Sequence, residues 1–142
     1  MAEIFISYKS ERRKAAEHLA EILHCYGYSV WFDYSLLKGA DFGFQIDAKI
    51  REAKAAVVLW CTKSVTSRWV AEEADLAREL GGLVPVKIEA CELPVGFRRL
   101  DYLDLSDWDG APRNHMLDRL LDELEQKTER GAALRSEGSA GL

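Results

Sequence analysis

The sequence predicts an α/β domain whose core is a doubly wound, five-stranded parallel sheet flanked by helices. Three observations lead to this prediction. Short apolar segments alternate five times with helical or loop segments, the middle apolar segment is hydrophobic at nearly every position, and the length of 142 residues suits one domain. A chain of this size buries roughly two-thirds of its unfolded surface, which is enough for a core without disulfides.

The expected strands are short apolar segments rich in β-branched side chains. They cover residues 4–7 (IFIS), 29–32 (SVWF), 55–60 (AAVVLW), 83–88 and 102–105. The third of these has almost no polar side chain, which is typical of a parallel strand covered by helices on both faces. We therefore expect residues 55–60 to form a central strand.

Helical periodicity fills the intervals between these strands. Four helices are expected, over about 11–26, about 42–53, from Ser67 to the Gly81-Gly82 pair, and about 114–128. In the first helix one apolar stripe is expected, formed by Ala15, Leu19, Ile22, Leu23 and Tyr26. Residues 129–142 (ERGAALRSEGSAGL) have little apolar content, so we expect a domain over 1–128 followed by a flexible tail or a linker to a further domain.

Composition narrows the partners and the compartment. A net charge of -5 argues against general attraction to nucleic acid or to an anionic membrane. The cysteines Cys25, Cys61 and Cys91 lie far apart without a CxxC motif, so we expect neither a disulfide framework nor a metal site. The first residues (MAEIFISYKSERR) contain no long apolar run, so a cytoplasmic protein is expected.

The residues after the strands exclude several nucleotide-binding and signalling classes. In a doubly wound sheet, ligands bind beyond the carboxyl ends of the strands. The first strand is followed by Ser7-Tyr8-Lys9-Ser10, not by the GxGxxG of a dinucleotide fold, although Asp33 ends the second strand as its ribose-binding acid would. No GKS or GKT follows the Gly-rich stretch, and Trp60-Cys61-Thr62 replaces the aspartate of a receiver domain.

Three boxes occupy the strand ends instead. They are FISYKS at 5–10, VWFD followed by LLKGADF within 30–42, and SRWVAEE at 67–73. In this order they resemble the hallmark boxes of TIR domains, and the resemblance extends over about residues 3–105. It implies a flavodoxin-like TIR fold.

The resemblance also implies an activity. TIR domains that are NAD⁺ glycohydrolases use a glutamate four residues after a tryptophan, which corresponds here to Glu73 after Trp69. Glu72 is the rival, but four residues place Glu73 on the face of Trp69, whereas Glu72 points about 100° away. One carboxylate suffices for this reaction, because nicotinamide in NAD⁺ is already a cationic leaving group. NAD⁺ is then the substrate, and no cofactor or metal is implied.

Further substrate contacts follow from the same resemblance. Trp31 matches the position on which TIR enzymes stack a substrate ring, and Trp69 and Asp33 belong to the same boxes. The residues expected to line the crevice are Ser7, Tyr8, Lys9 and Ser10. Lys9 would meet phosphate where the family often has arginine. Either tryptophan could instead belong to the core, and Asp33 could simply close a turn.

The loop at 34–43 is unusually apolar for a connection. Leu36, Leu37, Gly39 and Phe42 either fold back onto the domain or form a self-association surface, as the equivalent loop does in TIR families. We expect an NAD⁺ glycohydrolase that releases ADP-ribose or a cyclic isomer when TIR domains cluster, in bacterial anti-phage defence or signalling. A fused sensor domain could drive that clustering. The alternative is a non-catalytic TIR adaptor.

Overall fold

The computed structural model describes residues 2–32, 42–94, 96–97, 102–111 and 114–128. Within them lies a five-stranded sheet in the order β2-β1-β3-β4-β5, in which every neighbouring pair is parallel. The strands are β1 (Ile4–Ser7), β2 (Val30–Trp31), β3 (Ala55–Trp60), β4 (Leu83–Lys87) and β5 (Leu103–Asp104). The predicted doubly wound α/β fold is confirmed.

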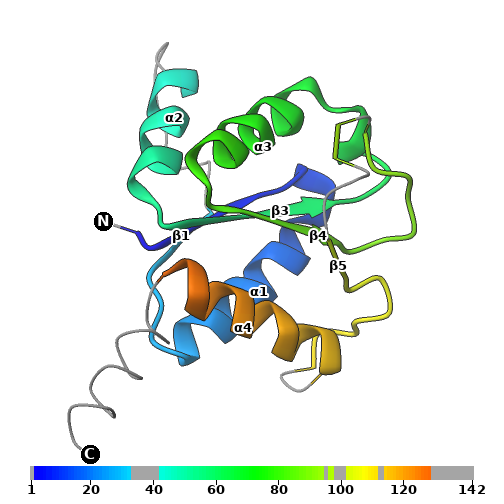
Figure 1. Ribbon diagram of the computed structural model, residues 1–142. Coiled ribbons are helices and arrows are strands. Elements are labelled where there is room, and N and C mark those ends of the chain that lie inside the picture. Colours follow the sequence, from blue (N-terminus) through cyan, green and yellow to red (C-terminus); the bar gives the residue numbers. More distant parts are fainter. Residues whose placement is uncertain (1, 33–41, 95, 98–101, 112–113, 129–142) are drawn as a thin grey trace, which may run out of the picture.

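Helices cover both faces of this sheet (Figure 1). One face carries α2 (Phe42–Glu52) and α3 (Arg68–Leu80), and the other carries α1 (Arg13–Cys25) and α4 (His115–Lys127). Two 3₁₀ turns complete the order, η1 (Ser10–Arg12) before α1 and η3 (Ser64–Thr66) before α3. The helices begin and end close to the residues that periodicity predicted.

β3 is the centre of the molecule. All six of its residues are buried, and it pairs with β1 on one side and with β4 on the other. Its side chains alternate between the layers, since Val57 and Leu59 pack toward α1 and α4 while Ala56 packs with Phe5 and with residues of α2 and α3. The prediction of a central strand at 55–60 is therefore confirmed.

The predicted stripe of α1 was partly wrong. Leu19 and Leu23 are buried, but the other buried positions are Ala16 and Ala20, and Tyr26 is 55% exposed. Tyr26 caps the helix rather than continuing it, so its side chain leaves the helical stripe. Ala16 and Ala20 belong to the core cluster that α1 shares with the strands of the sheet.

Two glycines, Gly81 and Gly82, form the connection from α3 to β4. Gly81 has φ of 80° and closes the helix in the left-handed conformation, so α3 ends at the glycine pair, as predicted. Gly82 lies against the start of β3, where a Cβ atom would come within 2.9 Å of the Lys54 carbonyl oxygen. Its own carbonyl accepts a 2.8 Å hydrogen bond from the Ala56 N–H. The close contact requires a residue without a side chain.

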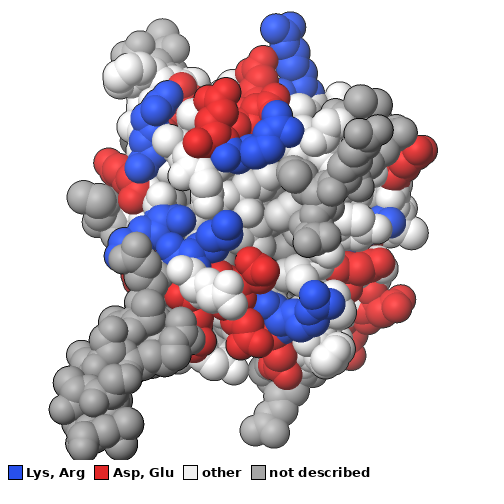
Figure 2. Space-filling model, in the orientation of Figure 1, with Lys and Arg blue, Asp and Glu red and all other residues white. Residues whose placement is uncertain are grey.

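Charges of both signs are interspersed over the face that Figure 2 presents. On that face, Lys and Arg side chains alternate with Asp and Glu side chains, so no basic patch dominates it. Among the described helices, none has the length and apolar character needed to cross a membrane.

The glycine contacts yield a stability prediction. Gly82→Ala should lower the free energy of unfolding by about 1–3 kcal/mol, because the added methyl group meets backbone that cannot move aside. Gly43→Ala is the matched control. Its Cβ would meet Trp69 only at an ordinary 3.8 Å, so loss of a helical glycine should stabilise the protein by about 0.5–1 kcal/mol. Urea denaturation of both variants measures the two effects, and equal shifts would contradict the close contact.

Candidate functional site

The strand order creates a crevice at the carboxyl ends of β1 and β3. The chain leaves β1 toward α1 on one face of the sheet and leaves β3 toward α3 on the other (Figure 1). Connections that diverge in this way leave an open edge between them, and this switch point is where doubly wound sheets bind ligands. Residues just after β1 and at the start of α3 therefore determine the site.

A hollow of about 260 Å³ lies at this switch point. Its lining residues are Tyr8, Lys9, Ser10, Arg13, Ser67, Trp69 and Val70. Four residues that the sequence proposed for substrate binding thus meet in one place, although they come from both ends of the crevice. We call this space the basic hollow, because its charged lining side chains are Lys9 and Arg13.

A second hollow of about 240 Å³ shares Trp69 with the first. It is lined by Gly43, Ile46, Asp47, Trp69, Glu72 and Glu73, from α2 and α3. We call it the acidic hollow. Trp69 lines both the basic and the acidic hollow, and it is 38% exposed.

The two adjacent glutamates of α3 have different surroundings. Glu73 is only 6% exposed and lies on the buried side of the helix with Val70 and Ala74. Glu72 is exposed, and its Oε1 atom accepts a hydrogen bond from the Arg68 Nε atom at 3.0 Å. Water screens the charge of Glu72, whereas a carboxylate with little water around it acts more strongly on a nearby charge. Burial and helical spacing therefore both favour Glu73 over Glu72 as the candidate catalytic carboxylate.

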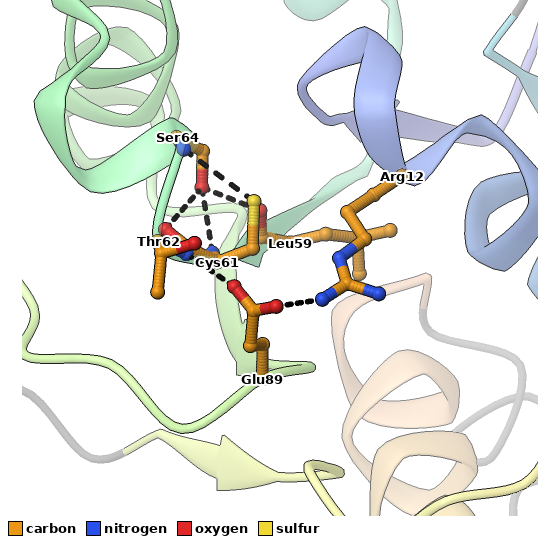
Figure 3. A network of polar contacts seen from close by, with 6 residues as sticks. All are labelled: Arg12, Leu59, Cys61, Thr62, Ser64 and Glu89. Carbon is orange, nitrogen blue, oxygen red and sulfur yellow. Dashed lines mark hydrogen bonds and ion pairs between the residues drawn. The ribbon is translucent and has the colours of Figure 1, made fainter.

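The start of α3 is fixed by hydrogen bonds from its own segment. The Ser67 Oγ atom accepts a hydrogen bond from the Val70 N–H at 3.3 Å and caps the helix, as the sequence predicted. Upstream, the hydroxyl of buried Ser64 accepts a hydrogen bond from the Cys61 N–H at 2.7 Å. The same hydroxyl donates to the Leu59 carbonyl at 3.1 Å (Figure 3). This network holds the turn between β3 and α3, and hence the position of Trp69.

Glu89 ties three segments of the same edge together. Its Oε1 atom accepts a 2.7 Å hydrogen bond from the Thr62 N–H, and its Oε2 atom forms an ion pair with Arg12 (Figure 3). The loops after β3 and β4 are thereby joined to the turn that precedes α1. Sequence reasoning missed this contact, although the position of Glu89 just beyond a strand was a usable signal.

Arg13 was also missed by sequence reasoning. Its NH1 atom donates to the Tyr8 hydroxyl at 3.5 Å, and its guanidinium lies 5.8 Å from the centroid of the Phe32 ring. Its Nε atom donates to a carboxylate oxygen of Glu17 at 2.9 Å. Tyr8 in turn donates to the Phe32 carbonyl at 2.8 Å. The available signal was spacing, because Arg13 follows Lys9 by four residues across a helical start.

Two of the proposed residues lie away from the hollows. Ser7 is 1% exposed beneath the crevice, and its hydroxyl has no hydrogen-bond partner among the described residues. Trp31 lines neither hollow and stacks on Phe5, with ring centroids 5.2 Å apart and an angle of 12° between the rings. The packing of Trp31 thus corresponds to the alternative of a core residue.

The remaining proposed residues fall in or beside the connection after β2. Asp33, Leu36, Leu37 and Gly39 lie outside the described residues, and Phe42 is described only as the first residue of α2. The expectations for these residues rest on sequence alone.

Cysteines near this edge have little nucleophilic character. Cys61 directly follows β3 but is 1% exposed. Burial raises the pKa of the Cys91 thiol, with the charge of Lys87 acting in the opposite direction. A thiol held neutral is a weak nucleophile. Within the described residues, no cluster of three or more His, Cys, Asp or Glu side chains could hold a metal ion.

Comparisons with known proteins agree with this architecture. The chain resembles the TIR domain of the Toll-related receptor TRR-2 from Hydra magnipapillata, with a TM-score of 0.75 and 18% identity over 88% of this chain and 99% of that one. It also resembles the TIR domains of the activated Roq1 resistosome, which recognises the pathogen effector XopQ. There the TM-score is 0.66, with 18% identity over 86% of this chain and 99% of that one.

A search of curated proteins finds no match. The family model described as "TIR domain" matches residues 4–121. The match includes all five strands and both hollows, so it extends beyond the boxes from which the resemblance was recognised. The chain belongs to the TIR domain family.

Proposed function

We propose that this TIR domain is an NAD⁺ glycohydrolase with Glu73 as its catalytic carboxylate. The observation that supports this proposal most directly is the burial of Glu73 one helical turn from Trp69, in a hollow that adjoins a basic one. An anion with little water around it, beside an aromatic side chain, suits a substrate that develops positive charge on a sugar.

The proposed reaction breaks the bond between C1′ of the ribose and the nicotinamide nitrogen. The electron pair of that bond leaves with nicotinamide, which becomes neutral, and positive charge spreads over C1′ and the ring oxygen. Glu73 stabilises this charge electrostatically. Water then attacks C1′ and releases its proton to solvent, which gives ADP-ribose. Attack by a nucleophile of the substrate itself would give a cyclic isomer.

Glu73 is the first test of this mechanism. Glu73→Gln keeps the size of the side chain and removes its charge, so NAD⁺ cleavage should fall by about 10²-fold or more. The measurement is nicotinamide release by concentrated protein, with the products separated by chromatography. A circular dichroism melt should show that the variant keeps its fold.

Glu72→Gln is the matched control for this test. It makes the same change one residue earlier, on a side chain that is exposed and paired with Arg68. Loss of an exposed ion pair is worth at most about 1 kcal/mol, so cleavage should change by less than about fivefold. Loss of activity in Glu72→Gln with retention in Glu73→Gln would reverse the assignment. No nicotinamide release by the unaltered protein would favour the TIR adaptor.

We also propose that self-association activates the enzyme, in cytoplasmic defence or signalling. The proposal rests on the apolar segment at 34–43, which enters α2 directly, and α2 lines the acidic hollow. A neighbouring domain that contacted this segment would act next to the catalytic carboxylate.

Concentration dependence tests the activation proposal. NAD⁺ cleavage per molecule should rise with protein concentration, and Leu37→Asp should weaken both association and cleavage, because it puts a charge on an apolar contact surface. Light scattering and nicotinamide release measure the two properties on the same samples. Lys38→Asp, the neighbouring polar position, is the control. Turnover that is independent of concentration would contradict activation by association.

A further inference from the structure

We infer that a groove at the β4–β5 edge of the sheet is a second ligand site, which takes a phosphorylated nucleoside. This edge groove has a volume of about 490 Å³, larger than either hollow at the switch point. Small-molecule sites commonly enclose about 300–1,000 Å³, so the groove has a suitable size. The inference does not depend on the proposed glycohydrolase, because it concerns a different part of the molecule.

The edge groove lies at the opposite end of the sheet from the candidate active site. Gly81 and Leu83, at the amino end of β4, line it, whereas the crevice follows the carboxyl ends of β1 and β3. Helix α3 borders the groove on one face of the sheet and α4 borders it on the other (Figure 1). A ligand in the edge groove would therefore leave the crevice open.

An incomplete strand pair forms the apolar part of the groove. β5 pairs only with Val86 and Lys87 of β4, so no described strand lies beside the first half of β4. The lining there includes the buried residues Val84 and Pro85. Tyr102 also lines the groove and is 40% exposed. Buried apolar side chains beside an exposed aromatic ring suit a flat ring of a ligand.

This edge is poorly suited to an added peptide strand. The Lys87 carbonyl accepts a 2.7 Å hydrogen bond from the Leu105 N–H, so Lys87 directs its backbone groups toward β5. Backbone direction alternates along a strand, so Pro85, two residues earlier, faces the same side. Proline has no N–H to donate to a neighbouring strand. A small molecule, which needs no ladder of backbone hydrogen bonds, therefore fits the groove better than a peptide.

Positive charge predominates among the side chains that line the groove. Its described charged residues are Arg78, Arg119, Lys127 and Glu123. On the mixed surface of this face, Lys and Arg side chains lie on both sides of an uncharged area between α3 and α4 (Figure 2). Such an excess of cations favours an anionic ligand, and guanidinium groups match the oxygen atoms of a phosphate.

The three cations differ in their surroundings. The Arg78 NH2 atom forms an ion pair with Asp75 at 2.5 Å, which offsets part of its charge. The Lys127 Nζ atom donates to the Gly81 carbonyl at 3.2 Å, so this ammonium is held where α4 meets the end of α3. Arg119 is exposed and forms no ion pair with any described residue. Arg119 and Lys127 are therefore the main candidates for holding phosphate.

Glu123 indicates a hydroxyl-bearing part of the ligand. It is the one carboxylate among the described residues that line the groove. It lies four residues from both Arg119 and Lys127 on α4, and it forms an ion pair with neither. A carboxylate repels phosphate but accepts hydrogen bonds from ribose hydroxyls, as acidic residues do in nucleotide sites. An aromatic ring, a hydroxyl acceptor and cations together match the base, sugar and phosphate of a nucleoside monophosphate.

Calorimetry with adenosine 5′-monophosphate (AMP) tests the inference, with adenosine and inorganic phosphate as its separate parts. AMP should bind the full chain at least about tenfold more tightly than either part, because the groove contacts the ring and the phosphate together. Adenosine that bound as tightly as AMP would show that the cations take no part. Phosphate that bound as tightly would show that the ring has no place in the groove. Either result, or no binding of AMP, would overturn the inference.

Variants determine where AMP binds. Arg119→Gln should weaken AMP binding by about tenfold, as expected for lost hydrogen bonds to a charged group, and should leave adenosine binding unchanged. Arg51→Gln, the same change at an exposed arginine of α2, is the matched control and should have no effect. Lys9→Gln, which removes a cation from the basic hollow, should also leave AMP binding unchanged. Unchanged AMP affinity in Arg119→Gln would overturn the inference, and loss in Lys9→Gln alone would place AMP in the crevice instead.

Glu123 separates ligand contact from a structural role of α4. Glu123→Gln should weaken AMP binding by about threefold, because a charged acceptor of the ribose hydroxyls is lost. It should leave the affinity for inorganic phosphate unchanged or higher, since it removes a negative charge beside the cations. An equal loss for AMP and phosphate would show that Glu123 only supports α4 and would overturn its assignment to the sugar. NAD⁺ cleavage enters none of these measurements, so failure of the glycohydrolase would not affect them.

Discussion

The position of α3 relative to β3 is the constraint on which the candidate site depends. β3 is buried along its whole length. At its carboxyl end the chain enters a short turn held by Ser64, and Ser67 then caps α3. The far end of α3 is fixed by the close packing of Gly82 on the Lys54 carbonyl. These contacts hold both ends of α3, and Trp69 and Glu73 lie one helical turn apart on it.

Local charge at this crevice differs from the charge of the whole chain. The net charge of -5 would repel a dinucleotide diphosphate at long range, but salt screens that repulsion beyond about 8–10 Å. What a bound anion encounters is the arrangement within a few ångströms, where Lys9 and Arg13 face the basic hollow and Arg12 is neutralised by Glu89. The net charge therefore indicates which large partners the domain attracts at long range, and it says little about a ligand bound in the crevice.

Sequence patterns predicted the fold better than they predicted the site. Period-two and period-3.6 patterns report which side of each element meets the core, so the strands and helices were found nearly at their true ends. The exception in α1 arose because alanine contributes little to such a pattern. Ala16 and Ala20 could be recognised as buried positions only once the packing of the helix on the sheet was known.

The sequence predicts candidate site residues well when they lie in one helix or strand, and less well when they come from several. Trp69 and Glu73 are one turn apart on a single helix, so spacing alone placed them together. Arg13, Asp47 and Glu89 come from three different segments. The signals for Arg13 and Glu89, a spacing of four from Lys9 and a position just beyond a strand, do not report which segments approach one another. The family resemblance matched Trp31 to a position that stacks a substrate ring, and the structure adds that its ring stacks on Phe5.

Glu73 lies on the buried side of α3, where a carboxylate is unusual. Val70, Ala74 and Ala77 are the other buried residues of the helix, and Glu73 falls within the same stripe. Removing a carboxylate from water is costly, and an apolar side chain of similar volume would serve packing against the sheet at least as well. A glutamate in a buried stripe is expected where a site is shaped for chemistry. The exposed Glu72, paired along the helix with Arg68, has the ordinary role of a surface acid. The contrast between two adjacent glutamates on one helix is consistent with the proposal that Glu73, and not Glu72, serves the reaction.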